Sequence, residues 1–182
     1  NAGKGCQRAS TGCMQCYAER IVAVRFQHNP KLPMWHGLAR LNDKGEPRWT
    51  GEARFLPEVL DEPLRVRKPA RVFPFDMSDL FYEKFTNEQI AAVFGVMAAC
   101  PQHTFLVLTK RAERLPEWFS WIARDGQPEA RCLEIAADMI GDTPHGLRVY
   151  AALTARFAAC TNAPIGWPLP NVHLGVSAEN QE

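Results

Sequence analysis

Residues 104 to 111 read Thr-Phe-Leu-Val-Leu-Thr-Lys-Arg, an apolar run that ends abruptly in polar side chains. The run from Thr104 to Leu108 is continuous, apolar and rich in β-branched and aromatic residues, which is typical of a strand buried on both faces. Such strands occur mainly in parallel sheets that are covered by helices. The stretch therefore predicts an α/β fold, and it places Thr109, Lys110 and Arg111 in the loop after the strand.

The sequence on either side repeats this alternation of strand and helix. Short apolar runs at 71–75 and 172–176 predict two further strands. Between the first of these and residue 104, Thr86 and Gln89 form a capping box at the start of an amphipathic helix that ends before Pro101. The pattern predicts a parallel sheet, open or barrel-like, with functional residues in the loops after the carboxyl ends of its strands.

Residues 124–167 break this rhythm. They contain two helical stretches, at 133–140 and 147–157, separated by Gly141-Asp142-Thr143-Pro144. We interpret this region as a helical insertion into the α/β pattern.

The chain has 182 residues, 46% of them apolar, and a net charge of +1, which predicts a single domain over 1–182 and no overall attraction to nucleic acid. It begins at Asn1, and residues 177–182 resemble the opening of another element, so we expect a domain that is incomplete at both ends. No apolar run approaches the roughly 18 residues that span a bilayer, and no signal peptide is visible. These features predict a cytoplasmic protein without membrane contact.

Three of the six cysteines lie close together near the start of the chain. Cys6, Cys13 and Cys16 form a C-x6-C-x2-C array in a loop that contains glycines and leads into a helix. Three thiolates can bind a metal or an iron–sulfur cluster while one coordination position stays open. A structural zinc site would need a fourth ligand, which His28 or His36 could supply. The spacing leaves zinc and iron both open, although it is not a common zinc spacing and so weakly favours iron.

Several motifs, in order along the chain, carry a resemblance to a known family. They are Gly12-Cys13-Met14-Gln15-Cys16-Tyr17-Ala18-Glu19, Trp35-His36-Gly37-Leu38, Met77-Ser78-Asp79-Leu80-Phe81, Leu108-Thr109-Lys110-Arg111, and Pro170-Asn171-Val172-His173-Leu174-Gly175-Val176-Ser177 with Glu179-Asn180-Gln181. In these motifs the chain resembles the phage-type radical-SAM-like family of bacteria and phages, where SAM is S-adenosylmethionine. Some members of that family are encoded beside a "three-Cys-motif partner" protein.

This resemblance implies a partial (β/α) barrel of radical-SAM type in which Cys6, Cys13 and Cys16 bind a [4Fe–4S] cluster. The open iron would chelate S-adenosylmethionine, and one electron from the cluster would cleave it to a 5′-deoxyadenosyl radical that abstracts a substrate hydrogen. The implied partners are the three-Cys-motif partner protein and a reductant such as flavodoxin or ferredoxin, with a nucleic acid or nucleotide as a substrate suggested by analogy. The usual signature is C-x3-C-x2-C, so the six-residue gap before Cys13 departs from the family pattern.

Polar side chains follow each predicted strand, and parallel strands end at one edge of a sheet. We therefore expect these side chains to face the cysteine loop. Carboxylates and hydroxyls would accept hydrogen bonds from the ammonium or ribose hydroxyls of the cofactor, and a cation would meet its carboxylate. The candidates for cofactor binding are Ser78, Asp79, Lys110, Ser177 and Glu179. The alternative function is a non-enzymatic binding module, stabilised by zinc or a cluster, that acts through a partner protein.

Overall fold

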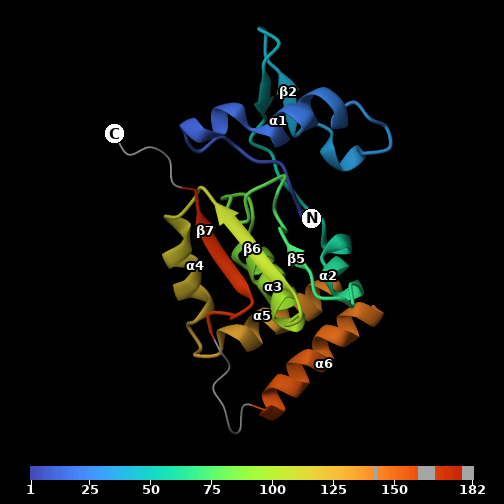
Figure 1. Ribbon diagram of the computed structural model, residues 1–182, viewed down its shortest axis with the longest axis vertical. Helices are drawn as coiled ribbons and strands as arrows, with labels where there is room; N and C mark the ends of the chain where they lie inside the picture. The colour runs from blue at the N-terminus through green and yellow to red at the C-terminus, as the bar shows by residue number, and fades with distance from the viewer. Residues whose placement is uncertain (142, 160–166, 178–182) are drawn as a thin grey trace.

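A three-stranded parallel sheet lies at the centre of the computed structural model, which describes residues 1–141, 143–159 and 167–177 (Figure 1). Its strands have the order β5-β6-β7 and span Arg71–Val72, Thr104–Thr109 and Val172–Val176. All three pair in parallel, with Phe105 of β6 opposite Val72 on one side and Val172 on the other. The predicted α/β class and its three parallel strands are confirmed.

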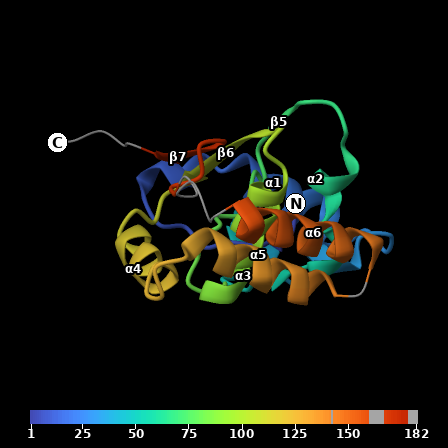
Figure 2. The same ribbon diagram turned by 90° about the horizontal axis from the view of Figure 1, so that it is seen from below.

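Helices cover one face of this sheet (Figures 1 and 2). They are α3 (Asn87–Ala99), α4 (Arg114–Ile122), α5 (Pro128–Ile140) and α6 (Pro144–Ala159). The predicted capping box of α3 is present: Thr86 Oγ1 accepts from the Gln89 amide at 3.2 Å, and Gln89 Oε1 accepts from the Thr86 amide at 3.0 Å. These reciprocal bonds satisfy amides that the first turn of the helix leaves without partners.

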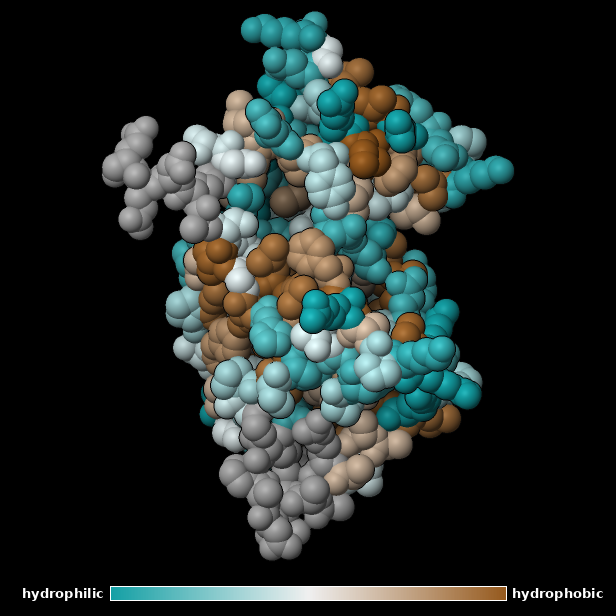
Figure 3. All heavy atoms as spheres, in the orientation of Figure 1, coloured by the Kyte–Doolittle hydropathy of each residue, from teal (hydrophilic) through white to brown (hydrophobic). Residues whose placement is uncertain are grey.

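The other face of the sheet is apolar but open to solvent. Phe105, Val107 and Thr109 of β6 point toward the helices and are 1–2% exposed, whereas Leu106 and Leu108 are 39% and 48% exposed. Figure 3 shows apolar side chains gathered over this part of the molecule. The prediction that β6 is buried on both faces is therefore wrong for this structure, because the described elements cover only one of them.

The described part of the region predicted as a helical insertion consists mainly of helices α5 and α6, and α5 belongs to the core. Helix α5 packs along α3, and Cys132, Leu133, Ala136 and Ala137 are fully buried. Gly95 in the middle of α3 allows this approach, because a Cβ there would lie 2.1 Å from the Cys132 carbonyl oxygen. Alanine-rich α5 and this glycine let the two helix backbones come close together.

A second, smaller hydrophobic cluster supports the cysteine loop. It joins α1 (Tyr17–Ile21), the π-helical turn Val22–Phe26 that continues it, the 3₁₀ turn Pro33–Trp35, and the antiparallel hairpin of β2 (Ala39–Leu41) and β3 (Pro47–Trp49). Its buried members are Ala18, Val22, Ala23, Trp35, Leu38, Ala39 and Met77. Figure 1 shows this part above the sheet, beyond the carboxyl ends of its strands.

Short elements link the two parts. β1 (Gly3–Lys4) pairs antiparallel with β4 (Arg54–Phe55), and Gly5 then forms a parallel bridge with Ser78. The 3₁₀ turn Pro57–Val59 and α2 (Glu62–Arg65) follow β4. The described residues form no closed barrel, and none of their helices has the length and apolar character needed to cross a membrane.

Candidate functional site

One pocket of about 360 Å³ lies between the cysteine loop and the carboxyl ends of the sheet strands. The three clustered cysteines line it together with the residues that follow β5, β6 and β7. These residues are Cys6, Cys13, Cys16, Ser78, Asp79, Lys110 and Ser177. Glu179, the remaining candidate, lies outside the described residues. The structure thus brings the other candidates to one place, and their roles in binding stay predictions.

The cysteine loop is shaped by tight turns. The Cys13 amide donates to the Ser10 carbonyl at 3.1 Å, and the Cys16 amide donates to the Cys13 carbonyl at 3.2 Å within the 3₁₀ turn Thr11–Gln15. Cys16 is then the N-cap residue of α1, and its carbonyl accepts from the Arg20 amide at 3.3 Å. Cys13 and Cys16 are therefore presented on one compact turn next to the start of a helix.

Cys6 contacts a buried cation. Its Sγ is 3.9 Å from Nη1 of Arg111 and 3.4 Å from the carbonyl oxygen of Gln7. Burial raises the pKa of the Cys6 thiol to about 12, although the positive charge of Arg111 opposes that rise. Without a metal this side chain is a neutral thiol at pH 7, so metal binding here must release its proton.

The types of side chain in this pocket suit an iron–sulfur cluster, but their positions are not those of a formed metal site. Three thiols share a pocket with hydroxyl, carboxyl and ammonium groups, which is a suitable donor set for a cluster with one open position. In the described part of the chain, however, no three His, Cys, Asp or Glu side chains already stand as a metal-holding group. Binding would have to draw the loop sulfurs together, which couples it to local folding.

The histidines proposed as a fourth zinc ligand lie elsewhere. His36 Nε2 is 2.9 Å from the Asn29 carbonyl oxygen, and His28 is exposed with Nε2 at 2.8 Å from the Gln27 side chain. Neither belongs to the described residues that line the cysteine pocket. The structure therefore offers no histidine from this pair beside the three thiols.

Asp79 ties the loop after β5 to the loop after β6. Its Oδ1 accepts from Thr109 Oγ1 at 2.8 Å and from the Phe81 amide at 2.9 Å. Its Oδ2 accepts from the Lys110 amide at 2.9 Å and lies 3.4 Å from Nη1 of Arg111. The Asp79 side chain is 8% exposed. Its hydrogen bonds to other protein groups hold in place the two loops that form the floor of the pocket.

The other candidates are also held by the backbone. Ser78 Oγ donates to the Gly5 carbonyl at 2.6 Å, which fixes the end of β1 beside the loop after β5. The Ser177 amide donates to the Thr109 carbonyl at 3.0 Å and so continues the β6–β7 pairing into the pocket wall. Lys110 lines the same pocket with a half-buried side chain.

Sequence reasoning missed the importance of Arg111. The residue is 7% exposed, and its guanidinium lies 4.6 Å from the ring centroid of Tyr82 and donates from Nη2 to the Gln7 carbonyl at 2.9 Å. The sequence placed Arg111 after a strand but gave no sign that it turns inward. A possible signal was the pairing of one acidic strand-end loop with one basic strand-end loop, which parallel strands bring together.

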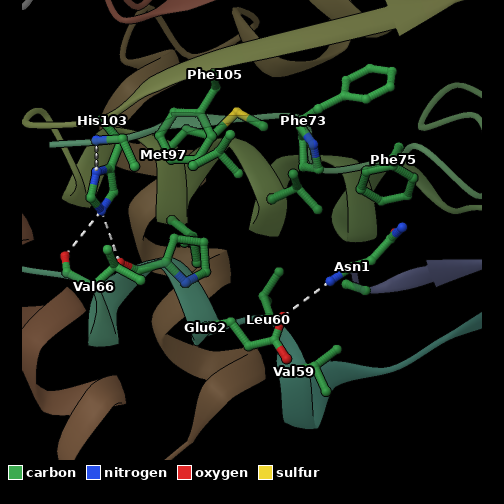
Figure 4. Close-up of a pocket in the computed structure, with 17 residues that line it drawn as sticks. Asn1, Val59, Leu60, Glu62, Val66, Phe73, Phe75, Met97, His103 and Phe105 are labelled. Atoms are coloured by element: carbon green, nitrogen blue, oxygen red, sulfur yellow. Dashed lines mark hydrogen bonds and ion pairs between the residues drawn. The ribbon is translucent and has the colours of Figure 1, made fainter. Parts of the chain in front are cut away.

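A separate apolar cavity of about 210 Å³ lies beside β5 and α3 (Figure 4). Val93, Val96 and Met97 of α3 form part of its wall. Its polar groups lie at opposite ends: His103, whose ring is bonded to backbone groups, and Glu62, which pairs with the amino group of Asn1 at 3.1 Å. No cysteine is among the described residues that line this cavity, which belongs to the packing between helix and sheet.

Comparison with known proteins identifies one family, and the function of that family is unknown. Searches among curated proteins and among solved structures returned no significant match. A family model described as "Protein of unknown function (DUF5131)" matches residues 1–182. Because that match covers the whole sequence, the chain belongs to the DUF5131 family.

Proposed function

We propose that this chain is a radical-SAM-like iron–sulfur protein in which Cys6, Cys13 and Cys16 hold a [4Fe–4S] cluster. The observation that carries the proposal is the gathering of these three thiols in one pocket with polar side chains from the ends of three parallel strands. A cluster held by three cysteines has one iron free of protein ligands, and that iron can bind S-adenosylmethionine and pass it an electron.

The finer fold that accompanies this proposal is a partial (β/α) barrel. The parallel bridge from Gly5 to Ser78 supports it, because it sets the strand before the cysteine loop alongside the segment after β5. The exposed apolar face of β6 and β7 also supports it, because the inner wall of such a barrel carries apolar side chains.

The chain's own residues would do the positioning. Arg111 would place positive charge beside Cys6 and lower the cost of a thiolate there, and Asp79 would hold Arg111 and the backbone of Lys110 in place. Lys110, Ser78 and Ser177 would present their polar groups to the cofactor. The partner protein, the reductant and the substrate implied by the family resemblance stay predictions.

Anaerobic reconstitution with iron and sulfide tests the proposal. The expected result is about four iron atoms per chain with matching sulfide, and their loss in Cys13→Ala. Cys132→Ala is the matched control, because Cys132 is buried between helices and should leave iron binding intact. Stoichiometric zinc without iron would contradict the proposal and favour the non-enzymatic binding module.

A further inference from the structure

Another cavity, of about 480 Å³, adjoins the cysteine loop and is rich in arginine. Arg8 of the loop, Arg20 of α1 and Arg48 of β3 line it, although they come from three separate segments of the chain. Arg8, Gln15, Cys16 and Tyr17 line this cavity and the cysteine pocket alike, so the two spaces share a wall. A molecule bound in one can therefore reach toward the other.

Two carboxylates also line the cavity, but they leave positive charge unbalanced. Glu19 is 1% exposed and accepts from Arg8 Nε at 3.0 Å and from the Trp49 amide at 2.7 Å, so it serves to hold Arg8 and β3. Glu46 pairs with Arg48 across a largely exposed contact, with side chains 50% and 33% exposed. An exposed pair of this kind is weak, and a stronger anion can replace the carboxylate.

The hairpin adds an independent sign of an anionic ligand. Arg40 of β2 lies directly opposite Arg48 of β3 in the antiparallel register. Like charges at opposed positions destabilise a two-stranded sheet. Within the part of the chain that the structure describes, the side chains of Arg20 and Arg40 form no ion pair or hydrogen bond. Of these two, Arg20 lines the cavity, and its guanidinium can bind the oxygens of a phosphate in a bidentate manner.

We infer that this arginine-lined cavity holds the phosphate group of a phosphate-bearing substrate, whose reacting part extends past Tyr17 into the cysteine pocket. Tyr17 is 55% exposed and lines both spaces, and Met14, which is 60% exposed, lines the arginine-rich cavity beside it. The inference rests on the proposed function, since it takes the cysteine pocket as the place of reaction.

The test measures binding to the metal-free chain by calorimetry, with adenosine 5′-monophosphate as the probe and adenosine as its phosphate-free counterpart. The nucleotide should bind and adenosine should bind at least about tenfold more weakly. Arg20→Gln combined with Arg48→Gln should reduce nucleotide affinity by at least about tenfold. Arg25→Gln is the matched control, because this exposed arginine lies on the π-helical turn outside the cavity wall.

Equal binding of the two probes, no saturable binding of the nucleotide, or an equal loss in Arg25→Gln would overturn the inference. Arg20→Gln alone keeps the test decisive if the double variant does not fold, because Arg20 is exposed and its side chain forms no ion pair or hydrogen bond with the described residues. Iron content after reconstitution is measured on the same variants. Normal iron content without phosphate binding would refute this inference and leave the proposed function standing. Phosphate binding without iron would refute the proposed function, and with it the reaction in the cysteine pocket, and leave only a phosphate-binding cavity.

Discussion

Asp79 connects the two strand-end loops that form the floor of the cysteine pocket. Asp79→Asn should destabilise the fold by about 3–5 kcal/mol, because it leaves the buried Arg111 guanidinium without its buried counter-charge. Glu83→Gln is the control, since Glu83 contacts the same guanidinium at 3.5 Å but its side chain is 62% exposed, so its loss should cost less than about 1 kcal/mol. Urea unfolding of both variants measures the difference, and equal losses would contradict the role assigned to Asp79.

The buried thiol of Cys100 should make the stability of the fold depend on pH in the alkaline range. Burial raises the pKa of its thiol from 9.0 to about 11, so the folded state resists ionisation more than the unfolded chain does. The resulting stabilisation is complete below pH 9 and is lost as pH rises through about 11. Urea unfolding at increasing pH should therefore show a shallower decline in Cys100→Ala than in the natural sequence. Identical declines would show that this thiol does not contribute, and Tyr82 and Cys132, whose pKa values burial also raises, would account for the effect.

At the scale of the element, the contact between α3 and α5 depends on Gly95. Gly95→Ala should destabilise the protein by about 1–3 kcal/mol, because the new Cβ meets the backbone carbonyl of Cys132, which cannot move without displacing α5. Gly175→Ala is the matched substitution in β7. Its Cβ would meet only the Cδ2 of Leu108, an exposed and movable side chain, so the loss should be smaller. Denaturant unfolding compares the two, and an equal or larger loss at Gly175 would contradict this account.

The helices and strands differ in how well their local sequence predicts them. Helix α3 carries its own start signal in Thr86 and Gln89, and the structure reproduces the capping box because its bonds are local. By contrast, β4 spans only Arg54–Phe55, and it pairs antiparallel with β1. Pairing partners distant in sequence are set by the packing of the whole chain, and a short apolar run cannot specify them.

At the scale of the molecule, two hydrophobic clusters hold the fold, and the smaller one carries α1 and the hairpin. Trp35 is 5% exposed within it and packs on Phe26 with ring centroids 5.5 Å apart. Trp35→Ala should destabilise the smaller cluster by about 3–5 kcal/mol. Amide hydrogen exchange should then be faster in residues 17–50, while α3 and α5 stay protected. Hydrogen exchange followed by mass spectrometry measures both regions.

Trp118→Ala provides the comparison for the larger cluster. Trp118 is fully buried against Phe94, at a centroid separation of 4.6 Å. Its loss should reduce protection of α3 and α5 as well. If Trp35→Ala also exposed these helices, the two clusters would unfold as one unit, and the cysteine loop could not order separately from the sheet.

The sequence by itself determined the α/β class, the start of α3, the presence of helices at α5 and α6 and the cysteine array, because each depends on residue types at short and regular spacings. It also placed Ser78, Asp79, Lys110 and Ser177 at strand ends. Only the tertiary structure decided that Arg111 turns inward to Cys6, that α5 belongs to the core through Gly95, and that one face of β6 is open. These features depend on contacts between residues far apart in sequence, and such contacts form only when the whole chain packs.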